Sequence, residues 1–510
     1  MKKSLHLKWW HRWLGITLTI PILLFALSGI VLNHRASISE FDVPRSFLPQ
    51  SYHYKNWNHG AIRGAVKLSP DSILLYGSQG IWLSDSLHNK IEPYSVGLKP
   101  AEGQMLLAMS RTTSGEFFAL SPFVCYRLDH KAQRWEAIWS RSETSERLSD
   151  MACRGDSLMI LSRSEVFYAQ EPYRRFERIE LPAPKDYQPS VSTFKTLWTL
   201  HSGELFGSIG IFVVDLLGVI IITLCLTGVV ILLCPSIVQR IKQRGGATRT
   251  TRRAFGIALR CHNKLGVWSL VGLLVLTITG TFLRPPLLIS IIRSKHTPLA
   301  GTHQDSSNPW QDKLRTIRYD AHAGDWLLYT SDGFYRTSSL ASDTPVKVAA
   351  VAPVSFMGIN TMQQLNSEAW LVGSFSGLYY WEIDSGECTD LYTKQPYVPK
   401  SGMPDFQHSV AGFCDLMMDK PIVFDYNRGA ESLVEGQKFA PMPEILAQSG
   451  RISLWHLALE VHTGRIYTFL PELAAQLFIF ISGISLLVIL LSGYIVYRRH
   501  HRKRKKPMKK

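Results

Sequence analysis

The chain lacks the short motifs by which many enzyme classes are identified. Its 510 residues contain no HExxH helix, no Walker-type phosphate loop, no GxSxG turn and no GxGxxG turn after a strand. No two of its seven cysteines form a CxxC pair, which excludes thioredoxin-type redox chemistry and the covalent attachment of c-type haem. Lacking a nicotinamide or flavin fold, the chain cannot collect hydride from a soluble carrier by itself.

Acidic residues are missing from three basic segments. Residues 1–12, 239–264 and 498–510 carry 21 Lys and Arg but no Asp or Glu. When these 21 are removed from the 56 Lys and Arg of the chain, 35 remain against 40 acidic residues. The net charge of +16 is therefore concentrated in short stretches, which argues against a nucleic-acid-binding face on a globular domain.

Charged residues are also scarce in four long apolar runs between the basic segments. The runs have 19, 26, 19 and 24 residues and contain one acid, Asp215. Because about 20 helical residues cross a bilayer core, we predict transmembrane helices over residues 13–33, 206–235, 262–285 and 472–497. The first run could instead be a signal peptide, but Asn33-His34-Arg35 follows it where a cleavage site needs small residues.

The positive-inside rule orients these helices. It places residues 1–12, 236–261 and 498–510 in the cytoplasm of a bacterial cell, with both chain ends inside. Residues 34–205 and 286–471 then lie outside the inner membrane. These two segments contain Cys125, Cys153, Cys388 and Cys414, which could form a disulfide or stay isolated thiols.

The chain contains an internal duplication. The sequence His-x-x-Leu-Gly at residues 11–15 recurs at residues 262–266, and Leu-His-Ser-Gly at 200–203 corresponds to Val-His-Thr-Gly at 461–464. The outer segments repeat as well. One unit of helix, outer segment and helix is thus present twice, in parallel topology, with a pseudo-two-fold axis expected along the membrane normal.

Both outer segments have short runs of β-branched and aromatic residues punctuated by Gly, Asp and Ser, which predict strands and tight turns. Units of about 40 residues with several strands are typical of propeller blades. Three such units per copy would allow one propeller shared by both copies, and two separate sandwich-like domains are the alternative. The predicted fold class is therefore an α-helical integral membrane protein, with a duplicated four-helix core (two helices per copy) and two β-rich extracytoplasmic segments.

Histidines stand at the ends of the predicted helices. The duplication makes His11 equivalent to His262 on the cytoplasmic side and His201 equivalent to His462 on the outer side. Facing imidazoles on bundle helices are what six-coordinate b-type haem iron needs. We predict that at least one pair binds haem, with one or two haems in total; the alternative is that each histidine is an amphipathic interface residue.

Small residues accompany these histidines and would let a flat macrocycle approach the backbone. They are Gly15, Gly29, Gly266 and Gly280.

Three further residues are site candidates. His34, at the outer end of the first helix, could replace one of the outer pair, hydrogen-bond a haem propionate or serve a second outer haem. Asp215 is the one acid inside a predicted helix, and such residues are functional candidates by default. It could pair with Arg284 or carry a proton, or it could extend to the nearby outer interface.

The membrane part of the sequence is similar to the PepSY-associated transmembrane family of bacterial iron-regulated inner-membrane proteins. The similarity rests on the HxxLG pattern, and on LHSG and VHTG ahead of helices that end in Thr227-Gly228 and Ser492-Gly493. It implies b haems held between helices and electron transfer outward, as in ferric-siderophore reductases. The outer segments depart from the family pattern because they show β-repeats and no recognisable PepSY domain.

Two functions follow from the sequence. The first is haem-containing transmembrane electron transfer, from a cytoplasmic or quinol donor to an extracytoplasmic acceptor such as a ferric complex. The second is a non-enzymatic, membrane-anchored ligand-binding or sensing protein with a propeller-like outer domain. The basic loop and tail could dock a cytoplasmic donor, although topology and anionic lipids account for them equally well.

Overall fold

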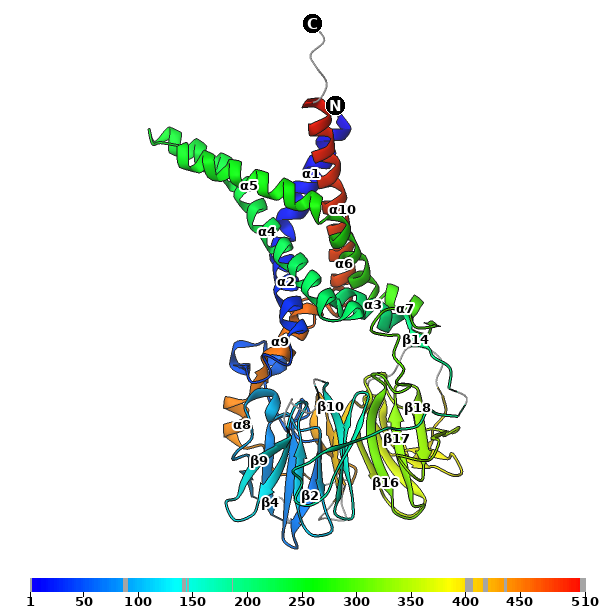
Figure 1. Cartoon of the computed structure of the whole chain (residues 1–510). Coiled ribbons are helices and arrows are strands. Elements are labelled where there is room, and N and C mark those ends of the chain that lie inside the picture. The colour runs from blue at the N-terminus through cyan, green and yellow to red at the C-terminus, as the bar shows by residue number, and fades with distance from the viewer. Residues whose placement is uncertain are drawn as a thin grey trace. The chain divides into compact units, whose positions relative to one another are not determined.

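The computed structural model describes residues 2–85, 90–139, 144, 146–185, 187–399, 407–415, 421–434 and 438–504. The last six residues of the predicted basic tail lie outside these ranges. The chain divides into two compact units, which Figure 1 shows coloured from blue to red along the sequence. The helical unit comprises Met1–Ile38, Pro189–Asp305 and Trp455–Lys510, and the strand unit comprises Ser39–Gln188 and Ser306–Leu454.

Two helices of the helical unit are unbroken over the length of a bilayer. They are α4 (Gly207–Gln243) and α10 (Glu472–Arg504), and each passes the length and apolarity required of a membrane span. Large apolar side chains such as Ile209, Phe212 and Val219 are exposed along α4. Because so much contiguous apolar surface is unfavourable in water, the chain is a membrane protein.

Two further apolar segments are bent helix pairs. Helices α1 (Lys2–Thr17) and α2 (Thr19–Asn33) meet at 60°, and α5 (Arg249–Trp268) and α6 (Leu270–Phe282) meet at 67°.

The two bends have different local causes. Pro21 follows the first break and has no N–H to donate to the Thr17 carbonyl. At the second break the Ser269 hydroxyl donates to the Leu265 carbonyl at 2.7 Å, a contact that bends helices. Because Leu18 and Ser269 are equivalent in the duplication, the bend itself is part of the repeated unit.

Short helices precede both unbroken helices. Helix α3 (Thr193–Ser202) begins where the Ser192 side chain accepts a hydrogen bond from the Lys195 amide, and it ends at Gly203 with φ +88°. In the second copy α9 (Leu454–His462) is followed by Gly464 with φ +77°. Glycine adopts such angles without steric cost, so the chain turns there, and α3 packs against α6.

The other elements of the helical unit are short. They are the 3₁₀ turn η4 (Glu204–Phe206), α7 (Leu287–Ile291), and the paired strands β14 (Val191–Ser192) and β15 (Lys295–His296).

The strand unit is built of antiparallel sheets in which consecutive strands are neighbours. The first outer segment supplies three sheets: β2–β5 (Gly64–Ser69, Ser72–Gly77, Gly80–Asp85, Ile91–Pro93), β6–β9 (Ala108–Arg111, Phe117–Leu120, Cys125–Asp129, Arg134–Trp139) and β10–β13 (Leu148–Arg154, Ser157–Ser162, Val166–Ala169, Glu177–Ile179). The second supplies β16–β19 (Leu314–Asp320, Asp325–Thr330, Gly333–Thr337, Val346–Lys347), β20–β24 (Ile359–Gln364, Ala369–Ser374, Gly377–Glu382, Cys388–Asp390, Gln395–Pro396) and β25–β27 (Val410–Cys414, Ile422–Asp425, Gly429–Ser432).

Smaller elements accompany these sheets. Strand β1 (Asp42–Pro44) pairs with β28 (Arg451–Ser453), and the others are η1 (Arg45–Phe47), η2 (Gln50–Tyr52), η3 (Ala101–Gly103) and α8 (Glu444–Ser449).

The first strands of these sheets contact one another in a closed ring. The order is β2, β6, β10, β16, β20, β25 and back to β2. A ring of radially placed antiparallel sheets is the arrangement of a β-propeller. One buried apolar cluster joins the two copies, with Leu161 and Val166 from the first and Ile317 and Leu328 from the second. Both outer segments therefore form one compact unit, and no disulfide links its four cysteines.

The predicted fold class is wrong. The chain is not an α-helical protein with β-rich appendages, because the larger of its two units is built of strands. Nor does it have a core of four uninterrupted transmembrane helices. Among the described residues, two helices meet the requirements of a span alone, and four spans result only if each bent pair is counted as one. An apolar run indicates the length of a segment but not whether its helix is continuous. This explains why four continuous helices were predicted where two of the segments are bent helix pairs.

Candidate functional site

Two pairs of histidines lie inside the helical unit. The ring centroids of His11 (α1) and His262 (α5) are 6.2 Å apart, and those of His201 (α3) and His462 (α9) are 6.1 Å apart. The ring planes are inclined by 82° in the first pair and 53° in the second. The structure thus brings together the residues that the duplication makes equivalent.

Three of the rings have Nδ1 against a backbone carbonyl: His11 at Ile489 of α10 (2.9 Å), His462 at Phe25 of α2 (3.0 Å) and His201 at Leu276 of α6 (3.1 Å). The fourth ring, His262, interacts with the Leu224 backbone of α4. A carbonyl oxygen can only accept a hydrogen bond, so Nδ1 is the donor. In a neutral imidazole the Nε2 atom then keeps its lone pair.

A hydroxyl group stands three residues after each of these carbonyls. The hydroxyl oxygens lie close to the same Nδ1 atoms: Ser28 to His462 at 3.0 Å, Thr227 to His262 at 3.0 Å, Thr279 to His201 at 3.1 Å and Ser492 to His11 at 3.5 Å. Each hydroxyl donates its own proton to a carbonyl in the preceding turn of its helix. The hydroxyl oxygen is therefore a second acceptor for the Nδ1–H group.

A glycine follows each hydroxyl residue, and the imidazole packs on it. A methyl group built on Gly280 or Gly493 would lie 2.7 or 2.8 Å from the Cε1 atom of the facing ring; on Gly29 and Gly228 the distances would be 3.2 and 3.6 Å. Carbon atoms in contact are normally about 3.5 Å apart or more. At least at Gly280 and Gly493, the ring thus occupies the space of a side chain.

We call these four dipeptides the Ser/Thr-Gly motifs: Ser28-Gly29, Thr227-Gly228, Thr279-Gly280 and Ser492-Gly493. Every motif belongs to the opposite copy from the histidine that it holds. Residues of one copy are thus positioned by helices of the other, which explains how equivalent histidines meet near the pseudo-symmetry axis.

The donor set fits haem iron. A metal–nitrogen bond is about 2.0 Å long and a ring nitrogen lies about 1.1 Å from its ring centroid, so two imidazoles on opposite sides of one ion have centroids about 6.2 Å apart. The observed 6.2 and 6.1 Å agree with this value. In the described part of the chain no Nε2 atom of these four residues has a hydrogen-bond partner, and no cluster of three or more His, Cys, Asp or Glu could hold a bare metal ion. Two imidazoles alone are the complement of a planar four-nitrogen macrocycle.

The two histidine pairs are close together along the helices. On α4, Gly218 packs against Ile30, next to the motif that holds His462, and Gly228 packs against His262. These glycines are ten residues apart, which corresponds to about 15 Å of helix. A bilayer core is about 30 Å thick, so the pairs are nearer to each other than the predicted positions at its two faces require.

Of the other predicted site residues, His34 and Asp215 pair with each other, whereas Arg284 lies beside His462. His34 does not join the outer pair, since its Nε2 lies 2.8 Å from Asp215 Oδ2, and the Asn33 amide donates to the same carboxylate at 2.9 Å. Arg284 donates to the Thr463 carbonyl at 2.7 Å and does not pair with Asp215. Asp215 is thus the partner of His34.

The predicted glycines have different surroundings. Gly29 and Gly280 receive the imidazoles of His462 and His201, whereas nothing lies within 4 Å of a methyl group built on Gly15, and Gly266 makes only an ordinary contact with Leu224. The role of the hydroxyl groups as acceptors was not predicted from the sequence. Their signal was present, because each of the four motifs has the same Ser/Thr-Gly pattern.

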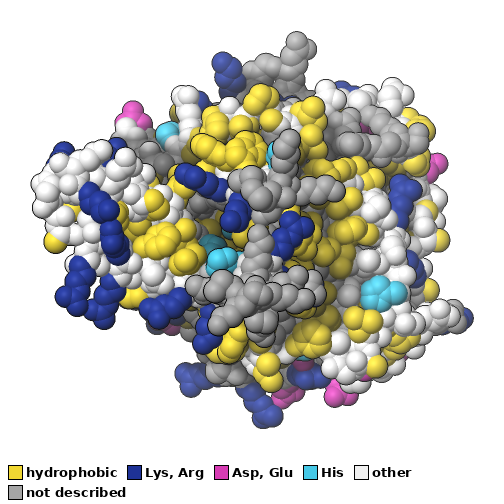
Figure 2. Space-filling model, turned by 90° about the horizontal axis from the view of Figure 1, so that it is seen from above, with side chains coloured by type: hydrophobic (Ala, Val, Ile, Leu, Met, Phe, Trp, Pro, Cys, Tyr) yellow, Lys and Arg dark blue, Asp and Glu magenta, His cyan; other side chains and the backbone are white. Residues whose placement is uncertain are grey.

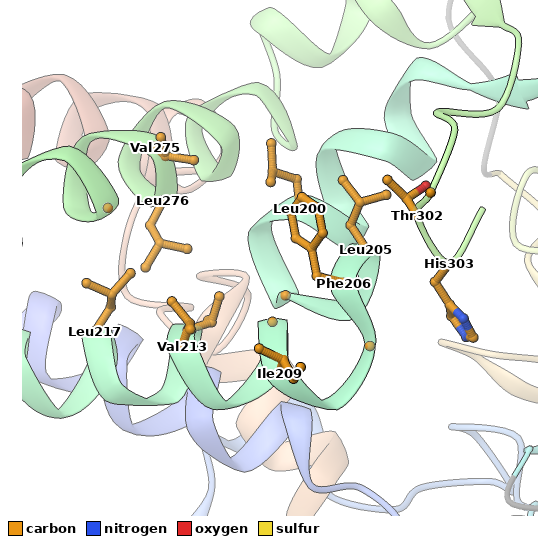
Figure 3. A pocket seen from close by; sticks show the side chains of 16 residues that line it. Leu200, Leu205, Phe206, Ile209, Val213, Leu217, Val275, Leu276, Thr302 and His303 are labelled. Carbon is orange, nitrogen blue, oxygen red and sulfur yellow. The ribbon is translucent and has the colours of Figure 1, made fainter. Parts of the chain in front are cut away.

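An apolar cavity of about 820 Å³ lies beside Leu200, the residue before His201 (Figure 3). It is lined by aliphatic side chains such as Val213 and Leu217, with Thr302 and His303 at one end. Leu276, whose carbonyl holds His201, also lines it. Such a lining suits an apolar molecule rather than a charged one.

The helical pattern matches a described protein family. The model of the PepSY-associated TM region matches residues 8–500, which is nearly the whole chain. The chain belongs to this family. No curated protein matches the sequence.

Solved structures resemble this PepSY-associated protein only weakly. The extracellular domain of BT4673 from B. thetaiotaomicron has a TM-score of 0.34 and 10% identity, over 76% of this chain and 40% of that one. A protein of unknown function from Bacteroides thetaiotaomicron VPI-5482 has a TM-score of 0.37 and 8% identity, over 76% and 70%. YCF48 bound to D1 peptide has a TM-score of 0.31 and 8% identity, over 74% and 93%. The chain spans about two fifths of the length of the first, and these similarities are too low to bear on function.

Proposed function

We propose that this protein transfers electrons across the bacterial inner membrane through b-type haem, held by His11 and His262 and by His201 and His462. The observation that carries the proposal is the pairing of imidazoles at the spacing of axial ligands, each with Nδ1 engaged and Nε2 unpartnered. Interface histidines would have no reason to adopt this arrangement four times.

The residues of the chain would hold and orient the cofactor. Four imidazoles would supply nitrogen ligands, and the Ser/Thr-Gly motifs fix the rings on the neighbouring helices. When bound, haem supplies a one-electron carrier whose potential depends on these ligands and on burial. The pairs are about 15 Å apart along α4, so they would be successive sites of one electron-transfer pathway.

We further propose that the protein crosses the membrane several times, with both ends and the basic loop in the cytoplasm. Figure 2 shows Lys and Arg side chains gathered on the lobe at its left, where Figure 1 has the arm formed by α5 and the end of α4. Seven cations on this arm are exposed: Arg240, Lys242, Arg244, Arg249, Arg252, Arg253 and Arg260. Such a patch favours the cytoplasmic side and could attract an acidic donor protein.

Electrons would enter from a cytoplasmic or quinol donor and leave to an acceptor outside, for which a ferric complex is the proposed chemistry. The direction follows from the proposed topology, because reducing equivalents are made in the cytoplasm. The strand unit would lie on the acceptor side.

The spectrum of the purified full-length protein tests this proposal. We expect a red protein with a reduced-minus-oxidised haem spectrum that changes in His262→Ala and in His201→Ala. His322→Ala, a substitution in the strand unit, is the matched control and should leave the spectrum unchanged. Colourless protein from haem-replete cells, or four axial substitutions without effect, would contradict the proposal and favour the binding or sensing role.

A further inference from the structure

We propose that the four Ser/Thr-Gly motifs are positioning residues that lock each histidine in the Nδ1–H tautomer before any cofactor is present. This inference rests on the proposed function for its purpose, but the tautomer itself is a property of the protein alone. Because the same contacts occur four times on four different helices, they belong to the repeated unit and are not an isolated packing contact.

The tautomer follows from the chemistry of the acceptors. In three motifs a carbonyl oxygen faces Nδ1 at 2.9 to 3.1 Å, and in the fourth the Leu224 backbone interacts with His262. The alternative tautomer would bring a ring lone pair against a carbonyl lone pair, which is unfavourable.

The hydroxyl group does not stabilise the alternative tautomer. A free hydroxyl could donate to an unprotonated Nδ1, but here its proton is directed into its own helix. Thr227 donates to the Thr223 carbonyl at 2.7 Å, and Ser28 donates to the Leu24 carbonyl at 2.6 Å. The hydroxyl oxygen thus presents only lone pairs to the ring, and both neighbours of Nδ1 are acceptors.

The glycine completes the motif by admitting the ring to this position. The Cε1 atom of each imidazole faces the glycine, and at Gly280 and Gly493 a side chain would push the ring away from the carbonyl. With Nδ1 fixed, Nε2 is the one nitrogen left for a ligand. A hydrogen bond from the second ring nitrogen to a carbonyl also makes the first nitrogen more basic, as in other metal-ligating histidines.

Ring-nitrogen NMR of haem-free, ¹⁵N-histidine-labelled full-length protein in detergent tests the inference directly. We expect four histidines in the Nδ1–H form at neutral pH, and each of these signals should vanish in the matching His→Ala variant. If any of these four histidines gave signals of the Nε2–H form, or of a fast mixture of both forms as in free histidine, the inference would be overturned. This result does not depend on whether haem binds.

The second arm uses Thr227→Val, which keeps the shape of the side chain and removes its hydroxyl. We expect its haem affinity to fall about 10- to 100-fold and its midpoint potential to rise, because a less basic His262 stabilises oxidised iron less. Thr227→Ser should restore both values. Thr223→Val is the matched control, since its hydroxyl donates to the Val219 carbonyl one turn earlier on α4 and contacts no histidine.

The outcomes separate the two proposals. If His262→Ala and the other three axial His→Ala variants all leave the spectrum unchanged, the haem proposal fails whatever the tautomer. If His262→Ala abolishes a haem signal but Thr227→Val equals Thr223→Val in affinity and potential, the positioning role of the hydroxyl is refuted while the haem proposal stands.

Discussion

The glycine under each imidazole allows a graded test of the site. Replacing Gly280 by Ala places a methyl group 2.7 Å from His201 Cε1, so the ring must move by about 0.8 Å to restore an ordinary carbon contact. That movement breaks the 3.1 Å bond from Nδ1 to the Leu276 carbonyl. Overpacking costs about 1–3 kcal/mol and the lost hydrogen bond about 1 kcal/mol, whereas Ala improves the helix by about 1 kcal/mol.

A net loss of about 1–3 kcal/mol lowers the equilibrium constant for His201 in its observed position about 5- to 150-fold. Gly493→Ala should behave in the same way, Gly29→Ala should be milder, and Gly228→Ala should be tolerated because its methyl group would lie at 3.6 Å from the ring. The assay is the haem content of each purified variant, with thermal unfolding by circular dichroism as the control for folding. Equal loss of haem in Gly228→Ala and Gly280→Ala, or full retention in Gly280→Ala, would refute the reasoning.

Three other substitutions test separate parts of the structure. Burial and the nearby Arg45 guanidinium lower the pKa of His59 to about 4. The free energy of unfolding should therefore be highest above about pH 6.5 and fall by up to about 3 kcal/mol as the pH drops to about 4. Urea unfolding at several pH values should show this fall in the wild type but not in His59→Asn, in which asparagine suits the positive φ of this position. Gly203→Ala should lower the stability by about 3 kcal/mol or more and remove the outer haem. The reason is that φ is +88° and a methyl group would meet the Gly210 carbonyl. A stable variant with a normal spectrum would contradict this. Asp215→Asn should leave the haem spectrum unchanged, since Asp215 contacts His34 and Asn33 rather than either pair; a shifted spectrum would show that it acts on the site.

The pairing of histidines could be predicted because it depends on symmetry rather than on detail. A duplicated chain with parallel topology must bring equivalent residues toward one axis, so His11 and His262 could be matched without knowing any helix angle. Symmetry alone does not determine which helix holds each ring. The crossing of every histidine to the opposite copy is a tertiary feature that leaves no local mark in the sequence.

The errors in the predicted fold have an equally physical cause. Long apolar runs are conspicuous, whereas the strands of the larger unit are two to seven residues long and are recognisable only from their repeated turns. The bend at Leu18 comes from the N–H that Pro21 lacks and the bend at Ser269 from one hydroxyl contact, neither of which hydropathy registers. The position of His34 was open for a similar reason, because its partner Asp215 is 181 residues away in the sequence.

The most direct test of the central claim is electron transfer across a sealed membrane. Vesicles of known orientation containing the purified protein should receive an electron donor on the side of the basic segments, with a membrane-impermeant ferric chelate on the other side. We expect reduction of the chelate in the wild type, and its loss in His262→Ala and in His201→Ala but not in His322→Ala. Reducible haem without any transfer to the chelate would contradict the account, and so would transfer that survives both axial substitutions.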